Sequence, residues 1–205
     1  MGVVDRLLVA VHGCHLDREE LGALGAAGGA IAYNPSSNMA LGDGVTDVPS
    51  ALESGVRVAL GTDGGCANNQ FDVFREMRAT EHLQRVTRRR MGVLTPFGGV
   101  ARLFAMGTVE GYRALGLEGG TIEAGAFADL VALDPDDPSL QPLLLDGDTA
   151  SDLERLLAQA AFAMSPRAAV TDVIVGGRAI VRQRTSVQVD ASEIAARVRV
   201  LPQLR

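Results

Sequence analysis

Short apolar runs separated by polar, glycine-rich segments recur along the first part of the chain. Three runs, 7–11, 29–33 and 56–60, are continuous rather than alternating, which is typical of strands buried on both faces of a parallel sheet. Helical patterns follow them: one begins at Asp17 with Glu20 placed for a capping box, and a second begins at Thr46 or Asp47. The order predicts three parallel β/α units.

A longer amphipathic helix is predicted over 71–88. Its expected apolar stripe consists of Phe71, Phe74, Met77 and Leu83. Further helical segments are predicted at about 96–106 and 108–115.

The pattern changes at Gly119. From there, short β-rich pieces alternate with Gly, Asp and Pro, and 171–181 predicts a hairpin that turns at Gly176-Gly177. A last helix is predicted over 191–200. The sequence therefore divides into an α/β part, 1–118, a β-rich part, 119–190, and a C-terminal helix or tail, 191–205.

Each apolar run is followed by a polar side chain that could take part in catalysis or ligand binding: His12, Asn34 and Asp63. The carboxyl ends of parallel strands carry the functional residues both in β/α barrels and in doubly wound sheets, so spacing alone leaves both folds open. A doubly wound binding domain is disfavoured because no glycine-rich phosphate loop follows the first run. Taken singly, Asp63 also fits a turn residue and His12 a core histidine, and two ligands do not complete a catalytic zinc site.

Composition and net charge limit the kinds of partner and the location expected for the chain. The chain has 205 residues and a net charge of −6, which argues against a nucleic-acid partner. Its two cysteines, Cys14 and Cys66, do not suggest a disulfide framework, and a reducing compartment is the simpler interpretation. Neither a transmembrane run nor a signal-peptide pattern is seen, so we expect no membrane partner and a cytoplasmic location.

Several motifs carry a family resemblance. "VAVHGCHLDREEL", "YNPSSNMALGDGV" and "GTDGGCANNQFDVFREMR" resemble, in order and spacing, the last three barrel strands of the metal-dependent amidohydrolase superfamily. The nearest likeness is to its cytosine deaminase and chlorohydrolase-like branch, which includes S-adenosylhomocysteine deaminases. "GTIEAGAFADLVALD" and "VTDVIVGGRAIV" resemble the β-sandwich segment that follows the barrel. The implied fold is a partial TIM-type β/α barrel over 1–118, followed by a small β-sandwich segment over 119–190.

The resemblance also implies roles for single residues. Asp63 corresponds to the eighth-strand metal ligand, which also takes a proton from the activated water. His12 corresponds to the sixth-strand histidine, which orients the water or polarises the substrate, and Asn34 and Asn38 would shape the substrate pocket. The implied reaction is metal-dependent hydrolytic deamination of a small heterocyclic amine, with one divalent metal, zinc or alternatively iron.

The chain departs from the family pattern in two ways. Ala67 stands where family members often carry Ser, which leaves the substrate open. The family's His-x-His pair, its fifth-strand His and the nearby general acid/base Glu have no counterpart in this sequence. We therefore expect a truncated enzyme that is inactive alone, or alternatively a non-catalytic scaffold or pairing module.

Incomplete closure of a barrel has a physical consequence. Three strands of eight cannot close, so strand edges and apolar faces at Leu7, Val9, Val58 and Leu60 are expected to be exposed. Such exposure favours a homo-oligomer or a complementing N-terminal fragment.

Overall fold

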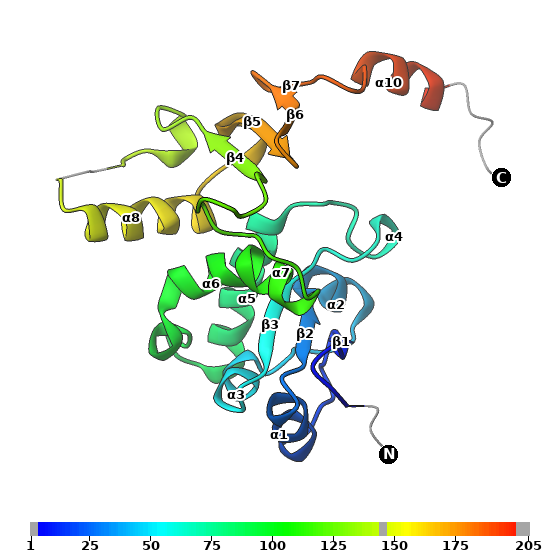
Figure 1. Ribbon diagram of the computed structural model, residues 1–205, viewed down its shortest axis with the longest axis vertical. Coiled ribbons are helices and arrows are strands. Elements are labelled where there is room, and N and C mark those ends of the chain that lie inside the picture. The colour runs from blue at the N-terminus through cyan, green and yellow to red at the C-terminus, as the bar shows by residue number, and fades with distance from the viewer. Residues whose placement is uncertain (1–3, 144–146, 200–205) are drawn as a thin grey trace.

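The computed structural model describes residues 4–143 and 147–199. Three parallel strands form its first sheet in the order β1-β2-β3, where β1 is Val9–Val11, β2 is Ala30–Tyr33 and β3 is Arg57–Leu60. Figure 1 shows them in the lower half of the molecule. The three predicted parallel strands are confirmed, each slightly shorter than its apolar run.

The predicted helices are also present. Helix α1 (Arg18–Ala26) begins with the expected capping box, in which the side chains and backbone of Asp17 and Glu20 bond reciprocally. Asp47 caps α3 (Val48–Glu53), and Asp72 caps α5 (Val73–Arg88). The sequence did not predict two short helices, α2 (Pro35–Leu41) and α4 (Gly65–Asn68), which follow β2 and β3.

An aliphatic core lies between the first sheet and the helices around it. It continues into η1 (Thr95–Phe97), α6 (Gly99–Gly107) and α7 (Val109–Ala114), and α6 and α7 pack against β3. Ile31, Tyr33 and Val58 are almost fully buried, so the expected exposure of Val58 is wrong. Both β1 and β3 are edge strands in the sheet order, and the apolar run that contains β1 leaves Leu7 and Val11 exposed. The first apolar run is therefore an edge strand and not one buried on both faces.

The buried face of α5 differs from the predicted apolar stripe. Phe71 precedes the helix and is exposed, and Leu83 is only partly buried. The residues that α5 buries are instead mostly polar: Glu76, Met77, Thr80, Glu81 and Gln84. Glu76 accepts the Ser36 backbone N–H of α2, and Gln84 donates to the Thr46 carbonyl, which explains why burial does not follow hydrophobicity here.

A second, antiparallel sheet forms in the C-terminal part, in the order β4-β5-β6-β7. Its strands are β4 (Leu130–Leu133), β5 (Val170–Val175), β6 (Arg178–Arg182) and β7 (Thr185–Ser186). The predicted hairpin turn at Gly176 and Gly177 is confirmed, since both have positive φ. Figure 1 shows this sheet above the first one.

The same part of the chain is less β-rich than expected. Besides η2 (Pro138–Leu140) and α9 (Pro166–Ala169), it contains a long helix, α8 (Thr149–Phe162), which packs on α5 and α6. Arg78 of α5 donates hydrogen bonds to the carbonyls of Ala161 and Met164, at 3.4 Å each. Residues 119–190 therefore pack, through α8, against α5 and α6. Their description as a sandwich segment stays a prediction.

The last described element is α10 (Ala191–Arg199), which stands apart from both sheets in Figure 1. It matches the predicted last helix, except that residue 200 lies outside the described residues. Within 4–143 and 147–199, no helix combines the length and apolar character needed to cross a bilayer.

Candidate functional site

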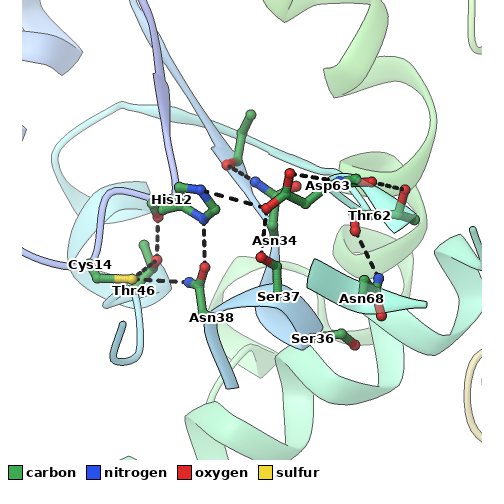
Figure 2. A network of polar contacts seen from close by, with 12 residues as sticks. His12, Cys14, Asn34, Ser36, Ser37, Asn38, Thr46, Thr62, Asp63 and Asn68 are labelled. Carbon is green, nitrogen blue, oxygen red and sulfur yellow. Dashed lines mark hydrogen bonds and ion pairs between the residues drawn. The ribbon is translucent and has the colours of Figure 1, made fainter. Parts of the chain in front are cut away.

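The structure brings His12 and Asp63 together at the carboxyl end of the first sheet. His12 directly follows β1 and Asp63 lies three residues beyond β3, with β2 between the two strands. The imidazole Nε2 lies 3.9 Å from the carboxylate Oδ2, and each side chain is about one-third exposed, at 31% and 34%. Figure 2 shows the two side chains facing each other. Part of each group is therefore accessible from solvent.

Both residues adopt a backbone conformation that side chains other than glycine rarely take. His12 has a φ of 66° and Asp63 a φ of 58°, which is the left-handed region. The neighbouring Gly13 also has a positive φ. Backbone strain of this kind persists where surrounding contacts over-determine it, and it is a recognised mark of functional sites.

Asp63 is held by two donors. The Ser37 hydroxyl donates to Oδ2 at 2.6 Å, and the Gly64 amide donates to Oδ1 at 2.6 Å. These hydrogen bonds, the one from Ser37 foremost, hold the pKa of the Asp63 carboxyl below its ordinary value. Asp63 is therefore a carboxylate at neutral pH, with lone pairs left for a further partner.

His12 is held from the other side. Its Nδ1 lies 2.6 Å from Oδ1 of Asn38, and Nδ2 of Asn38 lies 3.0 Å from Sγ of Cys14. The Thr46 hydroxyl donates to the His12 carbonyl in a close contact. Figure 2 shows these groups gathered around the imidazole, opposite Asp63.

Helix α2 supplies the contacts to both residues, because Ser37 reaches Asp63 and the adjacent Asn38 reaches His12. The helix is held in place by Glu76 of α5, a fully buried carboxylate. Its Oε2 accepts the Ser36 backbone N–H at 2.9 Å, and its Oε1 accepts Nδ2 of Asn68 at 2.9 Å. The same Nδ2 donates to the Thr62 carbonyl at 2.8 Å, next to Asp63. One buried group thus connects the supports of both site residues.

The two predicted substrate-binding residues lie in different surroundings. Asn34 is buried at the start of α2, and its side-chain amide donates to the Ala32 carbonyl at 3.1 Å. Asn38 is 1% exposed, and both its amide atoms have protein partners. Contact of either residue with a substrate stays a prediction.

The donor types around the site suit a divalent metal such as zinc, which prefers imidazole nitrogen and carboxylate oxygen. Asp63 could serve as a ligand, with His12 beside it. Among the residues that the structure describes, however, no group of three or more His, Cys, Asp or Glu side chains could hold a metal ion. A catalytic zinc site needs three protein ligands, so the described residues do not complete one by themselves.

Sequence reasoning did not identify Ser37 or Glu76. Ser37 lies 26 residues from Asp63 and Glu76 lies 40 residues from Ser36, so neither contact has a local signal. The available hint was a charged residue at an inward position of α5, one turn from the start of the helix. A buried carboxylate requires partners, and this alone would have pointed to Glu76.

Comparison with known proteins gives a consistent result. A family profile described as "Amidohydrolase family" matches residues 1–180 of the chain. The chain is 41% identical over 134 residues to a 5-methylthioadenosine/S-adenosylhomocysteine deaminase of Pyrococcus abyssi (strain GE5 / Orsay), covering 65% of this chain and 31% of the relative. It is 33% identical over 194 residues to a deaminase of the same description from Syntrophomonas wolfei, covering 95% of this chain and 42% of that protein.

Among solved structures, an adenosine deaminase from Xanthomonas campestris with bound zinc superimposes with a TM-score of 0.84 at 30% identity. The similarity covers 97% of this chain and 42% of that protein. The chain thus spans well under half the length of the proteins that it matches.

Proposed function

Because the chain belongs to the amidohydrolase family, we propose that it forms the part of a metal-dependent aminohydrolase that carries two active-site residues, His12 and Asp63. The reaction is hydrolytic deamination of a heterocyclic amine. Adenine nucleosides are the favoured substrate class, because the relatives are described as deaminases of such compounds.

One observation carries the proposal. His12 and Asp63 come from two strands separated by a third, yet their reactive atoms are 3.9 Å apart and both backbones are held in the left-handed region. A turn residue and a core histidine, each placed for local reasons, would not need to converge in this way.

Asp63 is the proposed metal ligand and proton acceptor, since its lowered pKa keeps it ionised. His12 orients the water or polarises the substrate, and Asn34 and Asn38 shape the pocket wall. Zinc is preferred over iron for these nitrogen and oxygen donors, and when bound it would supply Lewis-acid activation of water.

In this proposal, the three β/α units over 1–118 are the last three of an eight-stranded barrel. Residues 119–190 contribute to a sandwich, and the part over 191–205 begins with helix α10. The remaining barrel strands and metal ligands come from sequence that the relatives contain and this chain does not, on the same polypeptide or on a complementing N-terminal fragment. A homo-oligomer is the further possibility, and the proposed location is the cytoplasm.

A second candidate is a non-catalytic scaffold or pairing module. The observation in its favour is that residues 4–143 and 147–199 hold no group of three metal-ligating side chains. The two candidates differ in whether a complete site can be assembled around Asp63.

A complementation assay distinguishes them. The 205-residue chain with added zinc should release no ammonia from adenosine-, guanine- or cytosine-type amines. Addition of the N-terminal part of the Pyrococcus abyssi relative should restore activity with adenine nucleosides, and Asp63→Asn should lower the restored rate by roughly 10²-fold or more. Failure to restore activity in a stable complex favours the module. Robust turnover by the chain alone, abolished by Asp63→Asn, would refute the claim that the chain lacks a complete active site.

A further inference from the structure

We propose that Thr46, Cys14 and Asn38 are positioning residues that fix the neutral His12 ring in one tautomer, with the proton on Nδ1 and a free lone pair on Nε2. The catalytic meaning of this tautomer rests on the proposed function. The tautomer itself follows from a directional chain of hydrogen bonds that begins at Thr46.

Thr46 sets the direction of the chain. A threonine hydroxyl has a single proton, and here it is donated to the His12 carbonyl. Thr46 is 1% exposed, and its own carbonyl accepts Nε2 of the buried Gln84 at 2.9 Å. The residue is therefore held from both sides, and its hydroxyl oxygen can only accept from any further neighbour.

Cys14 is that neighbour. Its Sγ lies 3.6 Å from Oγ1 of Thr46, a contact in which either atom could formally donate. Because Thr46 has already used its proton, the thiol must be the donor. The remaining lone pairs of Sγ are then acceptors, which matches the approach of Nδ2 of Asn38 at 3.0 Å.

Asn38 passes the direction on to His12. With its Nδ2 donating to Cys14, its Oδ1 faces Nδ1 of the imidazole at 2.6 Å. An amide oxygen has no proton to give, so Nδ1 must carry the hydrogen. The reverse amide orientation would place the amide oxygen against the acceptor lone pairs of Cys14, two acceptors with no proton between them, and burial of Asn38 makes such a mismatch costly.

The consequence lies at Nε2. Its distance of 3.9 Å to Oδ2 of Asp63 exceeds hydrogen-bonding reach, so no hydrogen bond to that carboxylate requires a proton on Nε2. The histidine side chain in water favours the Nε2–H tautomer, so this chain of hydrogen bonds reverses the intrinsic preference of the ring. In the proposed enzyme, this arrangement presents an acceptor nitrogen beside Asp63, and the choice of tautomer follows from the bond made by the other ring nitrogen.

Nitrogen-15 NMR of the histidine rings tests the proposal directly on the full chain. The sequence contains three histidines, His12, His15 and His82, so assignment is tractable. Spectra are recorded near pH 9, well above the ordinary histidine pKa of about 6.5. We expect His12 to show a protonated Nδ1 and an unprotonated Nε2.

Two variants weaken the series of hydrogen bonds from Thr46 to His12 at different points. Asn38→Leu removes the acceptor and should lower the ratio of the Nδ1–H to the Nε2–H form by roughly tenfold, as expected for loss of one buried hydrogen bond. Thr46→Val removes the hydroxyl and should lower the ratio by a smaller factor. Thr46→Ser, which keeps the hydroxyl, should restore the ratio found in the unmodified chain.

The ring signals of His82, which stacks on Phe162 with centroids 6.1 Å apart, report whether each variant keeps its fold. A wild-type His12 protonated on Nε2 would overturn the proposal, as would an unchanged ratio in a folded Asn38→Leu variant. If Asn38→Leu does not fold, the wild type and the two Thr46 variants decide. These readouts involve no turnover, so their failure is separate from failure of the deaminase assay.

Discussion

Glu76 is the residue on which the site's supports converge. It is fully buried, and the two hydrogen bonds that it accepts come from uncharged groups, the Ser36 backbone N–H and the Asn68 side-chain amide. A buried carboxylate is tolerated only when hydrogen bonds compensate its lost hydration. Its effect on His12 and Asp63 is therefore indirect, through α2 and the loop after β3.

Replacement of Glu76 by Gln should expose this role. The amide nitrogen of Gln would face either the Ser36 N–H or the Asn68 side-chain amide, so one buried donor would lose its acceptor. We expect the free energy of unfolding to fall by about 1–3 kcal/mol in urea denaturation. Glu123→Gln, at an exposed position, should be nearly neutral. Equal stability of the two variants would contradict the assigned role.

For single residues, the sequence could suggest His12 and Asp63 as site residues because each follows an apolar run. It could not suggest Ser37, because a hydroxyl within "NPSSN" carries no signal of a partner 26 residues away. Nor could it show that Asn38 turns inward toward His12 and Cys14. That depends on α2 being a helix.

Among the elements, α1 and α3 meet at a close contact that depends on glycine. Gly25 of α1 lies against the backbone carbonyl of Ser54, at the end of α3, where an added Cβ would clash. Gly22, one turn earlier on the same helix, faces open space. The two positions therefore separate the packing effect of glycine from its effect on helix propensity.

Alanine substitutions at these two positions should act in opposite directions. Gly22→Ala should stabilise the chain by about 0.5–1 kcal/mol, since glycine is a poor helix residue. Gly25→Ala should destabilise it by about 1–3 kcal/mol, because α3 must move. Thermal and urea unfolding of both variants provide the measurement. A stabilising Gly25→Ala would show that the two helices are not tightly packed.

Element prediction succeeded where the pattern was local and failed where tertiary contacts decide. The capping box at Asp17 and the glycines of the β5–β6 hairpin are local signals, and both were interpreted correctly. Helix α2 begins "PSSN", which resembles a turn, and its first turn is stabilised by the distant Glu76. Helix α8 does carry a helical spacing of leucines, but the surrounding Gly, Asp and Pro residues favoured a β-rich interpretation.

At the scale of the whole molecule, a hydrogen-bonded carboxylate connects helix α7 to the second sheet. The Tyr112 hydroxyl of α7 donates to the Asp129 carboxylate, whose Oδ1 also accepts the Gly176 amide at 2.6 Å. These bonds, the one from Tyr112 foremost, hold the pKa of Asp129 below its ordinary value. The carboxylate therefore connects α7 to the turn between β5 and β6.

This link should make stability depend on pH in the acid range. Because the pKa of Asp129 is lower in the folded state, its contribution is fully present above the unfolded value of about 3.9 and is lost as pH falls through the folded value. Asp129→Asn and Tyr112→Phe should both reduce the loss of stability between about pH 5 and pH 2, measured by urea unfolding. Asp136→Asn, at an exposed site, should leave the profile unchanged. If the free energy of unfolding of the Asp129→Asn variant fell with pH as steeply as that of the unmodified chain, the link would be contradicted.

The overall α/β class and the three parallel strands followed from periodicity, because continuous apolar runs separated by capped helices have few alternatives. The position of the second sheet relative to the first did not. It depends on packing between α8, α5 and α6, which are distant in sequence.

The left-handed backbones of His12 and Asp63 have an evolutionary consequence. Each costs on the order of 1–3 kcal/mol relative to an unstrained residue, and glycine would relieve much of that cost. A lineage that no longer needed chemistry at this site would lose the selective reason to keep strained residues other than glycine at both positions. We therefore expect His12→Gly and Asp63→Gly to have higher thermal stability than His12→Ala and Asp63→Ala, because both substitutions lose the same hydrogen bonds and only glycine relieves the strain.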